Sequence, residues 1–427
     1  MRSLALLASL AALGSLAALL ACDKSAPHPN LLFVSIDTLR ADHLGCYGYP
    51  RKTSPNLDAF AAKSVVFDEA QSASSWTLPS LASLMTSLQQ STHRCEKDSS
   101  RLDPSYTTLA EVLRDAGYDT AFVASHLFLN AGHGLQQGFT HVDTRILQDE
   151  MAITSPAVTD WGVRWLEDKA AARDGTPWFL WLHYFDPHAP YLVHEGISDA
   201  FGTETDVDRY DGEIAFTDGH VGRLFDTFER LGFAENTIVV VVADHGEAFG
   251  EHGKPGHGYD LHQEVVRVPL ILRAPGLRPG RVREVVPTVD VMPTLLALCG
   301  TSARNEIAGR RLFDGAQAFT GSSEAVSEVR WQFEQDMKSL RRGSWKYVDN
   351  RRGEKAWREL YDHAADSGET TDLSAGRADV ASEMQHDLGA RLGKAAALAA
   401  LYERLETSDL PPGEIERLKA LGYAGDK

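Results

Sequence analysis

The chain is 427 residues long, with 43% hydrophobic and 24% charged residues, which is the composition of an ordinary globular protein. This balance excludes a chain that is disordered throughout, a collagen and a polytopic membrane protein. The formal net charge of −18 gives an acidic surface that repels phosphate backbones, so we expect no nucleic-acid partner. The length allows one large α/β domain with an appendage, or roughly two or three domains.

The first segment predicts a lipoprotein signal. An uncharged run from Leu4 to Leu20 follows Arg2, and Ala21 and Cys22 come directly after it. This ending resembles a bacterial lipobox, in which cleavage precedes a cysteine whose sulfur then carries a diacylglycerol. The alternative is an uncleaved membrane anchor, for which the run is at the lower limit of spanning length.

On this interpretation residues 1–21 are a signal peptide, and residues 22–29 are the lipidated Cys22 and a short tether. The predicted location is the bacterial cell envelope, facing the periplasm or the outside of the membrane, with the lipid anchor as the only membrane contact. Cys46, Cys95 and Cys299 then remain, which allows at most one disulfide, and the sequence leaves their pairing open.

The elements predicted downstream alternate between strands and helices. The predicted strands cover residues 31–36, 118–124, 178–185 and 237–243. The predicted helices cover residues 81–88, 105–116, 160–172, 213–231 and 289–298. This alternation predicts an α/β fold with a large, mostly parallel sheet sandwiched by helices.

The pattern changes near residue 323. Two short strands are predicted over 344–348 and 359–361, followed by helical sequence over 380–405. We therefore expect a catalytic domain over residues 30–322 and a smaller C-terminal α+β subdomain over residues 323–427.

Polar residues suited to metal binding lie at or near the ends of the predicted strands. Asp37 follows the first strand, and Asp244 and His245 follow the fourth. Ligands of parallel sheets bind beyond the carboxyl ends of the strands, and carboxylates with imidazoles can hold a divalent cation. Taken singly, Asp37 or Thr77 could be a helix N-cap and His188 a structural histidine, but their combination favours a site.

Several segments together resemble the sulfatase family of the alkaline-phosphatase superfamily, over most of the chain from Asn30 to Tyr423. They are NLLFVSIDTLRADHLGCYGYP, SSWTLPSLASLMTS, LHYFDPHAPY, YDGEIAFTD, VVVVADHGEAFGEHG and RVPLILRAPG, with VDVMPTLLALCG and ELYDHAADSGE as later landmarks. The resemblance implies one divalent metal ion (Mn²⁺, Zn²⁺ or Mg²⁺, with Ca²⁺ still open) and four residues at metal-ligand positions. These are Asp37, Asp244, His245 and the nucleophile Thr77. It also implies catalytic positions that bind the transferred anion or protonate the leaving group, namely His188, His257 and the weaker match His126.

The chain departs from the family pattern at the nucleophile. Sulfatases carry a cysteine or serine that is oxidised to formylglycine, where this chain has Thr77, and an arginine of the same signature is replaced by Leu81. We therefore expect no formylglycine. Further departures are Thr38 in place of a second acidic ligand, His257 in place of lysine and His262 in place of tyrosine.

The departures favour phosphoester over sulfate-ester substrates. A formylglycine hydrate releases sulfate by elimination, whereas a threonine ester must be opened by attack on the transferred atom, which phosphorus permits. The expected protein is a metal-dependent hydrolase of a small-molecule, glycan or lipid ester, acting through Thr77. The alternatives are a lipid-anchored transferase of the phosphoglycerol or phosphoethanolamine type, which modifies envelope lipids or glycans, and a non-catalytic binding lipoprotein that retains the fold.

Overall fold

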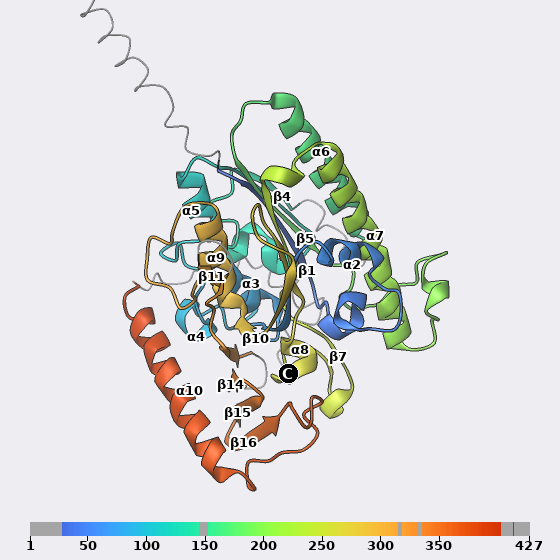
Figure 1. Cartoon of the computed structure of the whole chain (residues 1–427). Coiled ribbons are helices and arrows are strands. Elements are labelled where there is room, and N and C mark those ends of the chain that lie inside the picture. The colour runs from blue at the N-terminus through green and yellow to red at the C-terminus, as the bar shows by residue number, and fades with distance from the viewer. Residues whose placement is uncertain (1–27, 145–152, 315–317, 332–334, 403–412, 414–427) are drawn as a thin grey trace, which may run out of the picture.

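The computed structural model describes residues 28–144, 153–314, 318–331, 335–402 and 413 (Figure 1). The predicted signal peptide and Cys22 lie outside these residues. Within these ranges no helix combines the length and the apolar character needed to cross a bilayer. Cys46, Cys95 and Cys299 are free thiols.

An eight-stranded sheet forms the centre of the molecule, in the order β10-β2-β9-β6-β1-β5-β3-β4. Its strands in chain order are β1 (Asn30–Ile36), β2 (Val65–Gln71), β3 (Asp119–Ala124), β4 (His141–Asp143), β5 (Trp178–Tyr184), β6 (Thr237–Ala243), β9 (Leu270–Arg273) and β10 (Gly280–Pro287). Only β9 runs antiparallel to its neighbours, so the prediction of a mostly parallel sheet is confirmed. Strands β1, β5 and β6 are buried along their whole length, as expected for a sheet that is covered on both faces.

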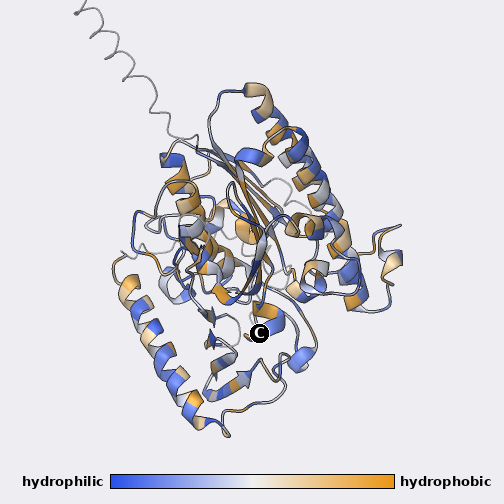
Figure 2. Ribbon diagram, viewed as in Figure 1, coloured by the Kyte–Doolittle hydropathy of each residue, from blue (hydrophilic) through white to orange (hydrophobic). Residues whose placement is uncertain are grey.

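Helices cover both faces of this sheet. One face carries α2 (Pro55–Ala61), α6 (Ser155–Ala172) and α7 (Asp206–Arg230), and the other carries α3 (Thr77–Thr86), α5 (Leu109–Asp115) and α9 (Val291–Leu298) (Figure 1). Two short helices, α4 (Gln90–His93) and α8 (Gln263–Val266), complete this part of the chain. The central strands are mostly hydrophobic in sequence, while the outer helices alternate in hydropathy (Figure 2).

Capping boxes explain where two predicted helices differ from the observed ones. Thr108 accepts a hydrogen bond from the backbone of Glu111, so α5 begins later than predicted. Thr205 forms the same box with Asp208, so α7 begins earlier than predicted.

The C-terminal subdomain is an antiparallel sheet with one long helix against it. Its strands are β13 (Glu324–Val329), β14 (Met337–Arg342), β15 (Trp345–Arg352) and β16 (Lys355–Asp362), and its helix is α10 (Ala378–Ala399). Two of these four strands were predicted. Minor pairs are formed by β7 (Ala248–Phe249) with β8 (Pro255–Gly256), and by β11 (Phe313–Asp314) with β12 (Ala318–Phe319). A small core that includes Leu340, Tyr347, Leu360 and Leu388 lies between this sheet and α10.

Candidate active site

The site forms at the carboxyl ends of two adjacent strands and the first residue of a helix. Asp37 follows β1, and Asp244 and His245 follow β6, which pairs with β1 in parallel. One ligand atom from each of these three residues lies within 4.8 Å of the other two. Thr77 begins α3, and its Oγ1 lies 3.1 Å from Nε2 of His245. The four residues at the predicted metal-ligand positions therefore meet at one place.

The donor atoms of this cluster fit a divalent cation. Oδ1 of Asp37 and Oδ2 of Asp244 are buried and accept no hydrogen bond within the described residues. Nδ1 of His245 donates to the carbonyl of Gly246 at 2.9 Å, which leaves the lone pair on Nε2 facing the cluster. Two unpaired carboxylate oxygens and one imidazole nitrogen are a ligand set that Mn²⁺, Zn²⁺ or Mg²⁺ accepts.

The electrostatics of the two carboxylates favour a cation beside them. Burial, together with the charges of Asp244 and Glu247, raises the pKa of Asp37 well above its ordinary value. Burial likewise raises the pKa of Asp244 to about 6. Two buried carboxylates that disfavour each other's ionisation gain stability from a cation between them.

Two histidines, His183 and His126, lie beside the Oδ2 atom of Asp37. Nε2 of His183 lies 3.2 Å from Oδ2 of Asp37, and Nδ1 of the same ring lies 2.8 Å from Oγ of Ser35. The predicted residue His126 accepts a hydrogen bond from the backbone N–H of Phe128 at its Nδ1, and its Nε2 lies 3.6 Å from Oδ2 of Asp37. His126 therefore contacts a metal-ligand carboxylate.

His188 and His257 lie beside each other with different hydrogen-bond partners. Their ring centroids are 5.0 Å apart, and the centroid of His257 is 4.4 Å from that of His245. Nδ1 of His188 donates to the carbonyl of Ala189, and burial lowers the pKa of His188 to about 4. Nδ1 of His257 donates to Oε1 of Glu247 at 3.0 Å, and although burial opposes it, the Glu247 carboxylate raises the pKa of His257. His257 is therefore the better proton donor of the two.

Other polar residues of the same segments have structural partners. Oγ1 of Thr38 donates to the carbonyl of Asp37, so Thr38 is turned toward its own backbone. The guanidinium of Arg40 binds the carboxylates of Asp42 and Glu251. The carboxylate of Asp186 accepts from the backbone N–H groups of Thr154 and Ser155 at the start of α6.

Sequence reasoning assigned no role to two residues of the site, His183 and Glu247, although both lie within the recognised segments. His183 lies within a strand, where a buried polar residue is easily taken as structural. The register of β1 with β5 places His183 beside Ser35. Two polar residues near the ends of two adjacent apolar strands could have indicated that His183 belongs to the site. Glu247 directly follows the Asp244–Gly246 turn and was hidden by its more obvious neighbours.

A second group of possible ligands, His252, His262 and Glu264, has a structural explanation. Nδ1 of His252 lies 2.7 Å from Glu264 and its Nε2 lies 3.0 Å from the carbonyl of Glu369, so both nitrogens of that ring are engaged. The rings of His252 and His262 stack in parallel with centroids 3.7 Å apart, whereas a shared metal would have to lie in both ring planes.

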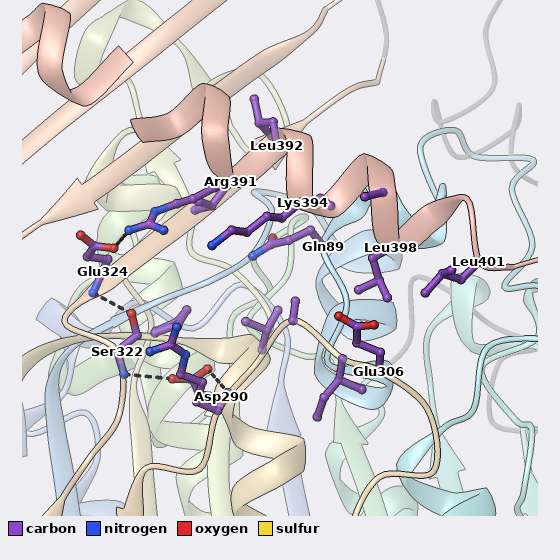
Figure 3. A pocket seen from close by; sticks show the side chains of 18 residues that line it. Gln89, Asp290, Glu306, Ser322, Glu324, Arg391, Leu392, Lys394, Leu398 and Leu401 are labelled. Carbon is purple, nitrogen blue, oxygen red and sulfur yellow. Dashed lines mark hydrogen bonds and ion pairs between the residues drawn. The ribbon is translucent and has the colours of Figure 1, made fainter. Parts of the chain in front are cut away.

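A cleft of about 640 Å³ lies elsewhere, between α10 and the main body (Figure 3). Leu392, Leu398 and Leu401 of α10 form its apolar side, and Arg391 pairs with Glu324 at its other end. Its lining includes none of the residues gathered around Asp37. The cleft is therefore separate from the candidate active site.

Comparisons with known proteins agree with this geometry. A curated relative, the ulvan-active sulfatase of Formosa agariphila, is 27% identical over 66% of this chain and 64% of its own length, slightly under two thirds. The choline-sulfatase of Rhizobium meliloti is 24% identical over 81% of this chain and 82% of its own. The phosphonate monoester hydrolase of Agrobacterium radiobacter has the same fold, with a TM-score of 0.74 at 20% identity over 86% of this chain and 96% of its own.

The sulfatase family model matches residues 29–301, which is well over half of the chain and includes every predicted metal-ligand residue. The matched segment contains the strand ends that carry Asp37, Asp244 and His245, and the helix that begins at Thr77. The chain therefore belongs to the sulfatase family, a group of ester hydrolases within the alkaline-phosphatase superfamily.

Proposed function

We propose that this protein is a metal-dependent hydrolase of phosphoesters, with phosphodiesters favoured, and that Thr77 is its nucleophile. The observation that carries the proposal is the position of Thr77 Oγ1, 3.1 Å from Nε2 of His245 at the edge of the ligand cluster. Asp37, Asp244 and His245 would hold the cation, with Thr77 beside it. When bound, a divalent cation supplies Lewis-acid stabilisation of charge on the oxygens of the transferred group.

The chain's own residues account for the remaining steps. Thr77 sits at the N-terminus of α3 with its side chain buried, where backbone N–H groups point toward an incoming anion. Its hydroxyl gives up its proton to solvent, its oxygen attacks phosphorus as the bond to the leaving oxygen breaks, and Nε2 of His257 protonates the leaving oxygen. Water then attacks phosphorus and returns a proton to His257. The bond between phosphorus and the Thr77 oxygen breaks, that oxygen takes up a proton from solvent, and the phosphomonoester leaves.

Phosphorus is preferred over sulfur because of the side chain at position 77. Threonine is a secondary alcohol, so its oxidation cannot give the aldehyde whose hydrate releases sulfate by elimination. The relatives named above as sulfatases favour a sulfate ester, whereas the phosphonate monoester hydrolase has the same fold and a name that implies attack at phosphorus. The choice of substrate therefore depends on the nucleophile and not on the fold.

The test is a direct comparison of substrates with the purified protein. Three substrates are assayed, namely p-nitrophenyl phosphate, a p-nitrophenyl phosphodiester and p-nitrophenyl sulfate. Each is tested with Mn²⁺, Zn²⁺, Mg²⁺ and Ca²⁺ in turn. We expect phosphoester hydrolysis that depends on added metal and little sulfate release. Sulfate-ester hydrolysis far above phosphoester hydrolysis would overturn the proposal.

We also propose that the protein is anchored to the bacterial envelope by a lipid on Cys22. The support is the sequence of residues 1–22 alone. An envelope location would give the enzyme access to glycan or lipid esters as well as to small molecules.

A further inference from the structure

The loop of residues 252–263 carries His257 and is contacted on one side by the C-terminal subdomain. We infer that Glu369 of that subdomain is a positioning residue, which fixes this loop and thereby sets the direction of His257. The inference rests on the proposed function, because it assigns a cause to the position of the proton donor. Glu369 is the last residue of the segment ELYDHAADSGE, to which the sequence assigned no role at the site, and it lies outside the metal-ligand cluster.

Glu369 holds both ends of the loop at once. Its Oε2 accepts a hydrogen bond from the backbone N–H of Gln263 at 3.0 Å. Its backbone carbonyl lies 3.0 Å from Nε2 of His252. Glu369 is 1% exposed, so its own oxygens are shielded from water, although His252 is exposed. A single buried residue therefore closes the loop at its first and last positions.

Two side chains of the same subdomain, Lys346 and His363, hold the carboxylate of Glu369 in place. Nζ of Lys346 lies 2.8 Å from its Oε1, and Nε2 of His363 lies 2.7 Å from the same oxygen. Lys346 also donates to the carbonyl of Leu261, a further loop residue. Burial alone would raise the pKa of Glu369, but the charge of Lys346 and the hydrogen bond from His363 lower it to about 2, so the group is ionised at neutral pH.

The contacts of Glu369 hold its backbone in a conformation that a non-glycine residue rarely adopts. Its φ is 54°, in the left-handed region that an ordinary side chain avoids. The neighbouring Gly368 would adopt that conformation without strain. A strained, buried and charged residue of this kind is commonly found where surrounding contacts fix a functional part of the structure.

The middle of the loop is held by the same subdomain. Nε2 of Gln335 donates to the carbonyl of Gly258 at 2.9 Å. The ring of Trp331 packs so closely on Gly258 that a Cβ there would lie 2.4 Å from a ring carbon. Gly258 directly follows His257, so the backbone next to the proton donor is fixed as well.

His257 is thus fixed from two sides. Glu247 of the catalytic domain binds its Nδ1, and the subdomain holds its backbone. Loosening the loop leaves Thr77 and the metal ligands in place but moves Nε2 of His257 away from the leaving oxygen. The hydrolysis rate then falls more for esters with poor leaving groups than for esters with good ones, because only a poor leaving group needs a proton in the transition state.

The experiment uses the full-length protein with its preferred metal and compares an alkyl with a p-nitrophenyl phosphodiester. In Glu369→Gln we expect kcat/KM for the alkyl ester to fall on the order of 10- to 100-fold further than for the nitrophenyl ester. The matched control is Glu328→Gln, another buried carboxyl of this subdomain, which accepts from Ser91 and does not touch the loop. Any loss in the control should be equal for the two esters.

Two additions keep the test decisive. If Glu369→Gln does not fold because Lys346 loses its partner, Gln335→Met loosens the loop instead. It also takes a partner from Arg352, but that side chain is partly exposed and water can replace the lost hydrogen bond. Hydrogen exchange is measured in parallel and should quicken over residues 257–263 while staying unchanged over residues 77–86. Equal losses for both esters, or unchanged exchange in the loop, would overturn the inference. A wild-type protein that hydrolyses neither ester contradicts the proposed function instead, and the exchange data still decide the role of Glu369.

Discussion

At the scale of single residues, Asp37 and Asp244 show how a site can be recognised before its ligand is seen. Each keeps one carboxylate oxygen for a cation while its other oxygen is occupied by the protein. Oδ1 of Asp244 accepts from the backbone N–H groups of Thr38 and His245, and Oδ2 of Asp37 faces His183. These second contacts orient the free oxygens, and a bound metal needs such orientation.

The first prediction is that Asp244→Asn abolishes metal binding without unfolding the protein. In the wild type, saturating Mn²⁺ at about 100 times its Kd should stabilise the fold by about 2.7 kcal/mol. In Asp244→Asn the Tm should not respond to metal, and the metal-free variant should melt no lower than the metal-free wild type, because a repulsion between buried carboxylates is gone. Calorimetry and elemental analysis measure both effects.

A matched control for this prediction is Asp218→Asn. Asp218 is another buried carboxylate, but it accepts from the backbone of Asn56 and Leu57. We expect this variant to lose stability and to keep its response to metal. Full metal content in Asp244→Asn would mean that the ligand assignment is wrong.

At the scale of elements, half of the strands in each sheet were predicted from the sequence: β1, β3, β5 and β6 in the main sheet, and β15 and β16 in the subdomain. Strands β1, β5 and β6 are buried on both faces, so they appear in the sequence as unbroken apolar runs. Strand β13 buries Ser327 and Glu328, which hydrogen-bond to Ser72 and Ser91 of the catalytic domain. Polar residues buried by tertiary contacts break the alternation on which strand prediction depends.

The same strand gives a prediction on pH. Burial raises the pKa of Glu328 from 4.5 to about 7, so between these values the folded protein binds a proton that the unfolded chain does not. Stability should therefore fall as pH rises from 4.5 to 7, by about 3 kcal/mol from this group, and then level off. Glu328→Gln should remove that slope, since its amide oxygen can still accept from Ser91. Urea unfolding across this pH range checks it, and an unchanged slope in the variant would contradict it.

At the scale of the whole molecule, the candidate site is assembled from segments far apart in sequence. The metal-ligand residues and the nucleophile could be named from the sequence because each belongs to a recognisable segment. The roles of Gln335, Trp331 and Glu369 could not be named, although Glu369 ends the recognisable segment ELYDHAADSGE, because these residues reach the His257 loop only through the packing of the subdomain on the main sheet. Contacts across such an interface leave no periodic signal in the chain.

Anchoring is also a property of the whole molecule, and it depends on residues outside those the structure describes. We expect Cys22→Ala to block lipidation and to leave an unprocessed or mislocated precursor, because Ala21 and Cys22 form the predicted cleavage site. Metabolic labelling with a tagged fatty acid tests this directly. Equal labelling of the wild type and the variant would rule the anchor out.

The central claim is that Thr77 forms a covalent bond to the transferred group. Its test is mass spectrometry of the peptide around Trp76 and Thr77 after acid quench during turnover of a slow phosphodiester. We predict an unmodified threonine at rest, one added phosphoryl group on Thr77 in turnover, and a kcat lowered by about 10⁴- to 10⁶-fold in Thr77→Ala, with partial activity in Thr77→Ser. Robust turnover by Thr77→Ala, with no phosphoryl group on the wild-type peptide, would contradict the account.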